Sequence, residues 1–360
     1  MNIVWNWLKD YVDLPWDVEE AVKRFTMAGL KVENLSREKL DLEGVVSAKV
    51  LDVRPHPNRA DLRVGTLYDG KERLSVVSGA PGLQTGNTVL LAVPGAHIPG
   101  QKPLLAMEVG GALSQGMVVC SNEILSGEAH RPGEDIIILP EGTPLGKSAQ
   151  ELLGLDDYVI ELELTVNYSH CLAVLGVAIE ASALSGVPLR LPPSLDKWGW
   201  ASKEGSRPPA GTPVYPGPIR IDLPDRDLCP RYVGKVVEGV QYTYSPPAIE
   251  RRLQLAGMRP ISAIVDATNY VMLETGQPLH AFDLDKLEGN VISARRSRPG
   301  ESIVTLDGET RPLAAGTLVI ADAGGPIAVA GVMGNRHTEV SEPTKRILIE
   351  SAYFASVPVR

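Results

Sequence analysis

The sequence lacks the features that mark several common classes of protein. No apolar run in its 360 residues approaches the roughly 20 residues that a membrane-spanning helix needs. The N-terminal stretch contains Lys9 and Asp10 and no small-residue cleavage site, so we expect no signal peptide. The cysteines are few, scattered and without a CxxC motif, which argues against a disulfide framework and a zinc site: Cys120, Cys171 and Cys229. We therefore expect a cytoplasmic protein with no membrane partner.

Basic charge and aromatic rings are also scarce. The formal net charge is −9, which argues against a protein that coats nucleic acid non-specifically but still allows a local basic face. Phenylalanine occurs only 3 times, and no P-loop string for ATP is present. Proline (29) and glycine (35) are abundant, which favours a turn-rich, strand-heavy chain. With 44% hydrophobic and 22% charged residues, the composition is typical of a globular protein, and the length allows two or three domains.

Helix signals dominate the first 38 residues. Asp17 can cap a helix with Glu20 three residues on, and Gly29 can end it. From Gly44 the pattern changes to short β-like runs separated by turn signals, such as VVSAKVLDV, LRVGTLYDG, RLSVVSGA, TVLLAVPG and GMVVCS. Five short strands over about a hundred residues predict a small Greek-key barrel, with the OB fold as the leading candidate.

Helix and strand signals resume after the barrel, which we therefore interpret as an insertion into a discontinuous scaffold. A stretch rich in Pro and Gly, carrying Trp198 and Trp200, follows as a linker. The remainder mixes strands with two helices, one beginning at Ser245-Pro246. The sequence thus predicts a multidomain α+β protein with an inserted OB-fold β-barrel and a following α+β domain. The expected parts are the scaffold (1–39 and 147–191), the barrel (40–146), the linker (192–218) and the last domain (219–360).

The barrel segment PHPNRADLRV clusters polar and basic groups in a strand and its turn. The candidate RNA-binding residues are Arg54, His56, Asn58, Arg59 and Arg63. Alone, this cluster could equally be a solvated barrel edge. Together with SGAPGL at 78–83 and GALSQGMVVCSNEIL at 111–125, it resembles the tRNA-binding domain that several synthetases and their accessory proteins share. Tyr68 is the sole aromatic residue expected to be available for stacking, so we expect a backbone-tracking contact of low specificity.

A second long string, ISAIVDATNYVMLETGQPLHAFDLDKL at 261–287, carries a stronger resemblance. With CPRYVGKVVEGV (229–240), AGVMGN (330–335) and RILIESAYF (346–354), it is similar to the editing module of bacterial phenylalanyl-tRNA synthetase β subunits. The order of the blocks also resembles that family over essentially the whole chain, as its N-terminal part. The resemblance implies that the chain binds tRNA(Phe) and hydrolyses mischarged Tyr-tRNA(Phe). It also implies that residues 219–360 form an α+β editing domain.

The editing chemistry follows from the amino acids involved. An apolar pocket for phenylalanine rejects an added hydroxyl only by roughly a hundredfold, and a size sieve fails because the wrong product is the larger. The editing site must therefore hydrogen-bond the phenol. Glu350 ends an apolar strand, where a carboxylate is out of place unless it is paired or functional. By the resemblance, Glu350 receives the tyrosine hydroxyl and His280 assists water. The resemblance also implies pocket-lining roles for Thr268, Asn269, Gly331 and Gly334. The alternative, non-functional interpretations are that Glu350 is a charged residue facing solvent and that His280 is a packed, hydrogen-bonded core residue.

Two departures from the family pattern stand out. The family's T-P-N-R-x-D-C string is here Thr165 to Cys171, TVNYSHC, without the Pro, Arg and Asp, and AGVMGG is AGVMGN with Asn335. The family also continues past the position of Arg360, so we expect a fragment of a longer subunit, with an incomplete editing pocket, rather than a natural short form.

The resemblance implies an α₂β₂ partner assembly in which ATP- and Mg²⁺-dependent aminoacylation resides on the α subunit. We expect no cofactor or metal in this chain itself and no aminoacylation by it; at most it is an aminoacyl-tRNA deacylase. The alternatives are a tRNA-binding scaffold without editing activity and a free-standing trans-editing hydrolase.

Overall fold

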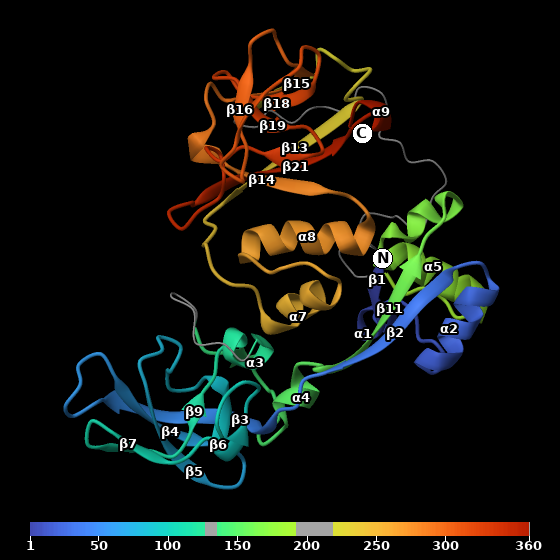
Figure 1. The fold of residues 1–360 in the computed structure, drawn as a ribbon. Coiled ribbons are helices and arrows are strands. Elements are labelled where there is room, and N and C mark those ends of the chain that lie inside the picture. The colour runs from blue at the N-terminus through green and yellow to red at the C-terminus, as the bar shows by residue number, and fades with distance from the viewer. Residues whose placement is uncertain (127–134, 192–218, 360) are drawn as a thin grey trace. The chain divides into compact units, whose positions relative to one another are not determined.

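The computed structural model describes residues 1–126, 135–191 and 219–359 and shows a mixed α+β protein (Figure 1). The predicted linker lies outside the described residues. The contacts between its residues divide the chain into two compact units. Unit 1 comprises Met1–Lys9, Trp16–Leu164 and Tyr244–Pro260, and unit 2 comprises Asp10–Pro15, Thr165–Thr243 and Ile261–Arg360. The finer division into scaffold, barrel and last domain stays a prediction.

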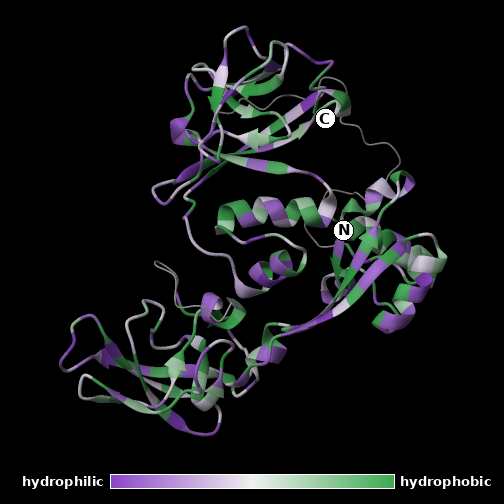
Figure 2. Ribbon diagram, in the orientation of Figure 1, coloured by the Kyte–Doolittle hydropathy of each residue, from purple (hydrophilic) through white to green (hydrophobic). Residues whose placement is uncertain are grey.

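Unit 1 begins with a three-stranded antiparallel sheet, in which β11 (Asp156–Glu163) lies between β1 (Asn2–Val4) and β2 (Lys31–Lys39). Because β11 pairs with strands that precede the barrel segment, this sheet is continuous across the inserted chain, as expected. The expectation of helix in the first 38 residues was wrong at β1 and at β2. Strand β2 carries charged residues on both faces and is largely hydrophilic (Figure 2), which hides its period of two.

The helices α1 (Trp5–Lys9) and α2 (Val18–Met27) confirm the other N-terminal expectations. The carboxylate of Asp17 accepts a hydrogen bond from the backbone N–H of Glu20 at 2.8 Å and caps α2. Unit 1 also contains α3 (Ser121–Ser126), α4 (Ala149–Leu152) and α7 (Pro247–Leu255), and α7 packs near β1 and α3. The helix predicted from Ser245-Pro246 is therefore confirmed.

The inserted segment of unit 1 folds into a curled sheet of six strands, all expected from the sequence except β10. Its path is β10-β6-β3-β4-β5, with β9 paired to β6. The long strand β3 pairs with β4 on one side and β6 on the other, and bulges at Glu43/Val45 and Val50/Asp52 bend it. The strands are β3 (Glu43–Pro55), β4 (Arg63–Tyr68), β5 (Arg73–Ser78), β6 (Thr88–His97), β9 (Met117–Val118) and β10 (Ile138–Leu139), with a small hairpin of β7 (Met107–Val109) and β8 (Ala112–Ser114).

Unit 2 is built on two sheets. The first has the antiparallel order β13-β21-β14, and the second has the order β12-β15-β18-β19-β20. Strands were expected in this region, and they are present. Strand β14 was missed because its sequence, LHAFD, shows no polar alternation. The bounds are β13 (Arg231–Glu238), β21 (Arg346–Tyr353), β14 (Leu279–Asp283), β12 (Arg220–Asp222), β15 (Val291–Arg296), β18 (Leu318–Ala321), β19 (Pro326–Val329), β20 (Met333–Gly334) and the hairpin β16 (Ser302–Val304) and β17 (Thr310–Pro312).

The three-stranded sheet of unit 2 has different neighbours on its two faces. Phe282 and Leu348 project into an apolar cluster with the five-stranded sheet, whereas Ala281 and Ile347 pack with Ile264 of α8. Helix α8 (Ala263–Thr275), the second of the two helices expected in this region, is capped by Ser262 and ends at the left-handed Gly276. The other helices are η1 (Val166–Leu172), α5 (Val174–Ser185), η2 (Leu284–Lys286) and α9 (Ser356–Val359).

No single helix among the described residues meets the length and apolarity of a membrane span; η1 and α5 pass only jointly, across a bend of 111°.

Candidate functional site

The central strand of the three-stranded sheet in unit 2 brings an acid and an imidazole together. In the register of the sheet, Glu350 of β21 lies directly opposite His280 of β14 on one side and Gly234 of β13 on the other. Directly opposed residues of antiparallel strands project from the same face. The carboxylate and the imidazole therefore share one face, and Gly234 contributes no side chain beside them. The Glu350 side chain points inward, with 8% of its surface exposed.

Glu350 already holds a phenol from its own chain. The hydroxyl of Tyr232, two residues before Gly234 on β13, donates a hydrogen bond to Oε2 of Glu350 at 2.8 Å. Burial raises the pKa of Glu350 to about 7, against a smaller opposite effect of this hydrogen bond. Burial, followed by the charge of Glu350, likewise raises the pKa of Tyr232 well above its usual value. The carboxyl group is thus poised between its neutral and charged forms near neutral pH.

His280 is neutral in its surroundings, because loss of hydration lowers the pKa of its imidazole to about 4. The ring lies edge-on to Phe282, with 4.6 Å between ring centroids. Gly334 makes room for it: a Cβ at that position would lie 2.6 Å from Nε2 of His280. The sequence-predicted residues Glu350, His280 and Gly334 therefore meet at one place.

The remaining predicted pocket residues lie differently. Thr268 is buried on α8, where its hydroxyl donates to the carbonyl of Val265 at 2.6 Å. Thr268 and Asn269 thus belong to a helix that packs on the Ala281 face of the sheet, which alternates with the face of His280 and Glu350. Gly331 adopts a φ of +71° at the turn between β19 and β20, and a Cβ there would lie 3.0 Å from Val359.

On the curled sheet of unit 1, two of the predicted RNA-binding residues hold a hairpin in place. His56 is buried, and its Nε2 donates to the carbonyl of Val109 at 2.8 Å while Nδ1 accepts from the backbone N–H of Asn58. The amide of Asn58 donates to the carbonyl of Gly110 at 2.8 Å. Both side chains therefore anchor the β7–β8 turn to the loop before β4.

The three arginines of the same segment differ in how much charge they offer to a ligand. Arg59 forms a two-pronged pair with Asp61, at 2.9 and 3.0 Å, so its charge is compensated locally. Arg63 reaches the carbonyl of Leu83 at 3.4 Å. Arg54 is exposed and makes no side-chain hydrogen bond or ion pair with any described residue. Among these side chains, Arg54 is the one most available to a phosphate.

Comparison with known proteins gives a family match for each of the two regions, the curled sheet of unit 1 and the sheet of unit 2 that carries Glu350 and His280. The family described as "Putative tRNA binding domain" matches residues 45–148, and the family described as "B3/4 domain" matches residues 228–360. The phenylalanine--tRNA ligase beta subunit of Moorella thermoacetica is 42% identical over 363 residues, covering 100% of this chain and 44% of its own length. The beta subunit of Carboxydothermus hydrogenoformans is 41% identical over 364 residues, which cover 100% of this chain and 43% of that subunit. The chain belongs to the phenylalanine--tRNA ligase beta-subunit family.

This member spans less than half the length of these beta-subunit relatives. Among solved structures, an N-terminal fragment of the phenylalanyl-tRNA synthetase beta subunit from Pyrococcus horikoshii is similar over 57% of this chain and 58% of that chain. Its TM-score is 0.30 and its sequence identity 16%. A MetRS-related protein from the same organism covers 28% of this chain and 84% of that chain, with a TM-score of 0.22 and 19% identity.

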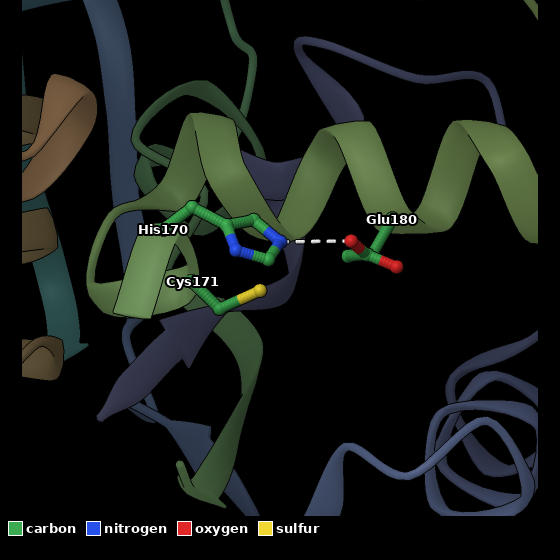
Figure 3. Close-up of side chains that lie close together, drawn as sticks. All are labelled: His170, Cys171 and Glu180. Carbon is green, nitrogen blue, oxygen red and sulfur yellow. Dashed lines mark hydrogen bonds and ion pairs between the residues drawn. The ribbon is translucent and has the colours of Figure 1, made fainter. Parts of the chain in front are cut away.

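The junction at which this beta-subunit member departs from the family pattern gathers three side chains that could hold a metal. The ligand atoms of His170, Cys171 and Glu180 lie within 4.8 Å of one another (Figure 3). Nε2 of His170 and Oε1 of Glu180 are hydrogen-bonded to each other at 2.8 Å. Burial, followed by the charge of Glu180, raises the pKa of the Cys171 thiol to about 12. A protonated thiol is a poor ligand, so the geometry favours an ion pair that closes over a packed cysteine.

Sequence reasoning missed Tyr232 in this family member. Its signal was present, because Tyr232 stands two residues before Gly234, and the period of two places both on the same face of β13. That face became identifiable only once the register of β21 was known.

Proposed function

We propose that this chain binds tRNA(Phe) and hydrolyses Tyr-tRNA(Phe) within a phenylalanine--tRNA ligase. The observation that supports the hydrolysis most directly is the cross-strand pair of Glu350 and His280 on a buried face, with glycines at Gly234 and Gly334 beside it. Gly334 leaves room for the imidazole of His280, and Gly234 lets Leu348 and Ile221 pack closely beside the pair, so both glycines fix the surroundings of the acid and the imidazole. We assign the aminoacyl end to this face of the sheet.

Selection of tyrosine rests on the carboxyl group of Glu350. Because it already accepts a hydrogen bond from the phenol of Tyr232, its surroundings suit a hydroxyl on an aromatic ring. A carboxylate has about four acceptor positions, so a second phenol can be accepted at the other oxygen. Leaving a buried acceptor unpaired costs about 1–3 kcal/mol, which corresponds to a preference for tyrosine over phenylalanine of roughly 5- to 150-fold.

Hydrolysis of the ester needs a positioned water. The imidazole of His280 is neutral near pH 7, since its pKa is lowered to about 4, and a neutral ring nitrogen can accept a hydrogen bond from water. Such a weakly basic group orients and polarises water more than it removes a proton. In this proposal Thr268 and Asn269 do not contact the substrate. They belong to helix α8, which supports the three-stranded sheet from the face opposite Glu350 and His280.

The curled sheet of unit 1 is proposed to be the OB-fold barrel that binds tRNA. Arg54 supports this reading because its charge is free to meet a phosphate, and the match to a putative tRNA-binding domain covers the sheet. His56 and Asn58 contribute indirectly, by fixing the β7–β8 hairpin that borders the same segment. Arg59 and Arg63 add weaker attraction.

The activity of the whole enzyme is proposed from the family. In that assembly an α subunit carries out aminoacylation with ATP and Mg²⁺, the complex is α₂β₂ and the compartment is the cytoplasm. The chain described here supplies tRNA binding and editing. A tRNA-binding scaffold without editing, and a trans-acting hydrolase, are the competing functions.

A deacylation assay on Tyr-tRNA(Phe) tests the editing function. The 360-residue chain is compared with Glu350→Ala and His280→Ala, with circular dichroism to verify folding and Phe-tRNA(Phe) as the control substrate. We expect hydrolysis of Tyr-tRNA(Phe) by the wild type and loss of most of it in both variants. Equal rates in all three proteins would remove the catalytic function and leave the scaffold.

A further inference from the structure

A polar cavity lies within unit 1 between the β1-β11-β2 sheet and helix α7. Its volume is about 340 Å³, which is within the range of sites for small ligands. A sheet face covered by a helix is normally apolar, because both elements bury their hydrophobic sides there. Here only two lining residues are apolar, namely Val159 and Leu255. The polar lining residues are Asn2, Asn34, Ser36, Glu38, Glu161, Arg251 and Gln254.

The pairing of the strands explains why these polar groups converge. Asn34, Ser36 and Glu38 alternate along β2 and so project from one face. Glu161 of β11 lies opposite Asn34 on one side and opposite Asn2 of β1 on the other. A row of two amides flanking one carboxylate therefore crosses the sheet and forms the floor of the cavity.

Helix α7 adds a buried guanidinium that lacks a full set of partners. Arg251 is only 8% exposed, and one terminal nitrogen donates to the backbone carbonyl of Glu38 at 3.1 Å. Its Nε–H has no hydrogen-bond partner but is closed off from solvent, so no ligand atom can reach it. The terminal nitrogen Nη1 makes no hydrogen bond with a described residue and, unlike Nε, is not fully buried. No carboxylate of a described residue lies within ion-pair distance of the guanidinium. A largely buried charged donor without an acceptor is costly, so Nη1 points to a ligand oxygen.

The charges of the lining define the class of ligand. Arg251 suits a carboxylate, while Glu38 and Glu161 repel a plain anion such as phosphate and attract an ammonium group. We propose that the cavity binds a small zwitterion of the amino-acid class. Its carboxylate accepts from Nη1 of Arg251, its ammonium donates to Glu161, and the amides of Asn34 and Gln254 orient it. This site is separate from the Glu350–His280 pair and does not depend on the proposed editing function.

Isothermal titration calorimetry of the 360-residue chain tests the proposal. The probes are glycine, alanine, phenylalanine and tyrosine, with propionate lacking the ammonium, ethylamine lacking the carboxylate, and inorganic phosphate. We expect saturable binding of at least one amino acid and at least tenfold weaker binding of the three partial probes. Absence of binding by every amino acid, or phosphate and propionate binding as tightly as the amino acids, would overturn the proposal.

Variants then assign the two ends of the ligand. Glu161→Gln is expected to weaken amino-acid binding at least tenfold and to leave propionate binding equal or stronger, an opposite response that mere loss of structure cannot give. Arg251→Lys keeps the charge but removes the terminal guanidinium nitrogens, and is expected to weaken amino-acid and propionate binding together. Glu33→Gln, on the opposite face of β2, and Arg220→Lys in unit 2 are matched controls. If Arg251→Lys fails to fold, the Glu161→Gln comparison decides alone: equal loss for both probes contradicts the assignment.

Discussion

The buried pair of Glu350 and His280 should give two opposing pH dependences of stability that nearly cancel in the wild type. The pKa of Glu350 rises from 4.5 to about 7 on folding. Between these values the folded state binds the extra proton, so its contribution to stability is present at low pH and is lost as pH rises through the folded pKa. From pH 5 to pH 8 that loss is about 2–3 kcal/mol.

His280 changes in the opposite direction. Its pKa falls from 6.5 to about 4 on folding, so in this window the unfolded state binds the extra proton. Stability therefore rises as pH increases, by about 2 kcal/mol from pH 5 to pH 8. The wild type should consequently change much less than either group alone would make it change.

Single substitutions separate the two effects. Glu350→Gln removes the contribution that falls with pH. Relative to the wild type, the free energy of opening of this variant should therefore gain about 2–3 kcal/mol between pH 5 and pH 8. His280→Asn removes the rising contribution and should lose about 2 kcal/mol relative to the wild type over the same range. The assay is hydrogen exchange of strand β21 (Arg346–Tyr353), corrected for the intrinsic pH dependence of exchange and expressed as a free energy of opening.

An exposed acid on another strand provides the control, and Glu43→Gln should follow the wild type at every pH. Curves for Glu350→Gln and the wild type that run parallel within about 0.5 kcal/mol would refute the reasoning, because the carboxyl group would then titrate as an ordinary exposed acid.

Three further outcomes are expected. Tyr232→Phe leaves the buried acceptor without its donor and should lower the free energy of unfolding by about 1–3 kcal/mol, measured by urea unfolding; an unchanged midpoint would mean that water replaces the phenol. Gly334→Ala places a methyl 2.6 Å from Nε2 of His280, so deacylation should fall at least tenfold while the circular dichroism spectrum stays the same, and full activity contradicts the placement of the ring. Arg54→Gln should weaken tRNA binding and reduce the slope of log affinity against log salt by about 0.7–0.9, whereas Arg59→Gln, whose charge is already paired, should change both less.

Much of the candidate site could be anticipated from the sequence because its signals are local or motif-borne. A carboxylate at the end of the apolar run Ile347 to Ile349 predicted an inward-facing acid at Glu350, and the structure places it there. His280 was identified from the long motif at 261–287 that contains it, and not from the residues next to it in the sequence. Its strand, β14, was not predicted, since LHAFD lacks the alternation that marks a half-buried strand.

Other parts of the site depend on pairings between distant segments. His280 and Glu350 are 70 residues apart in the chain, and only the register of β14 with β21 makes them neighbours. A shift of one residue would put them on opposite faces. The same register brings Tyr232 onto the carboxyl group and turns Ala281 toward the helix that carries Thr268, so the predicted pocket residues divide between two faces of the sheet.

By itself, the sequence determined most of the element types, the family and the inward-facing carboxylate of Glu350, because periodicity, capping and motif order are properties of short contiguous stretches. The tertiary structure alone decided which side chains share a face, which donors remain without a partner and where a cavity is left. The neutral imidazole of His280 and the half-charged carboxyl of Glu350 follow from burial, and the polar cavity around Arg251 follows from strand pairing. Neither burial nor pairing between distant segments is written in any one stretch of chain.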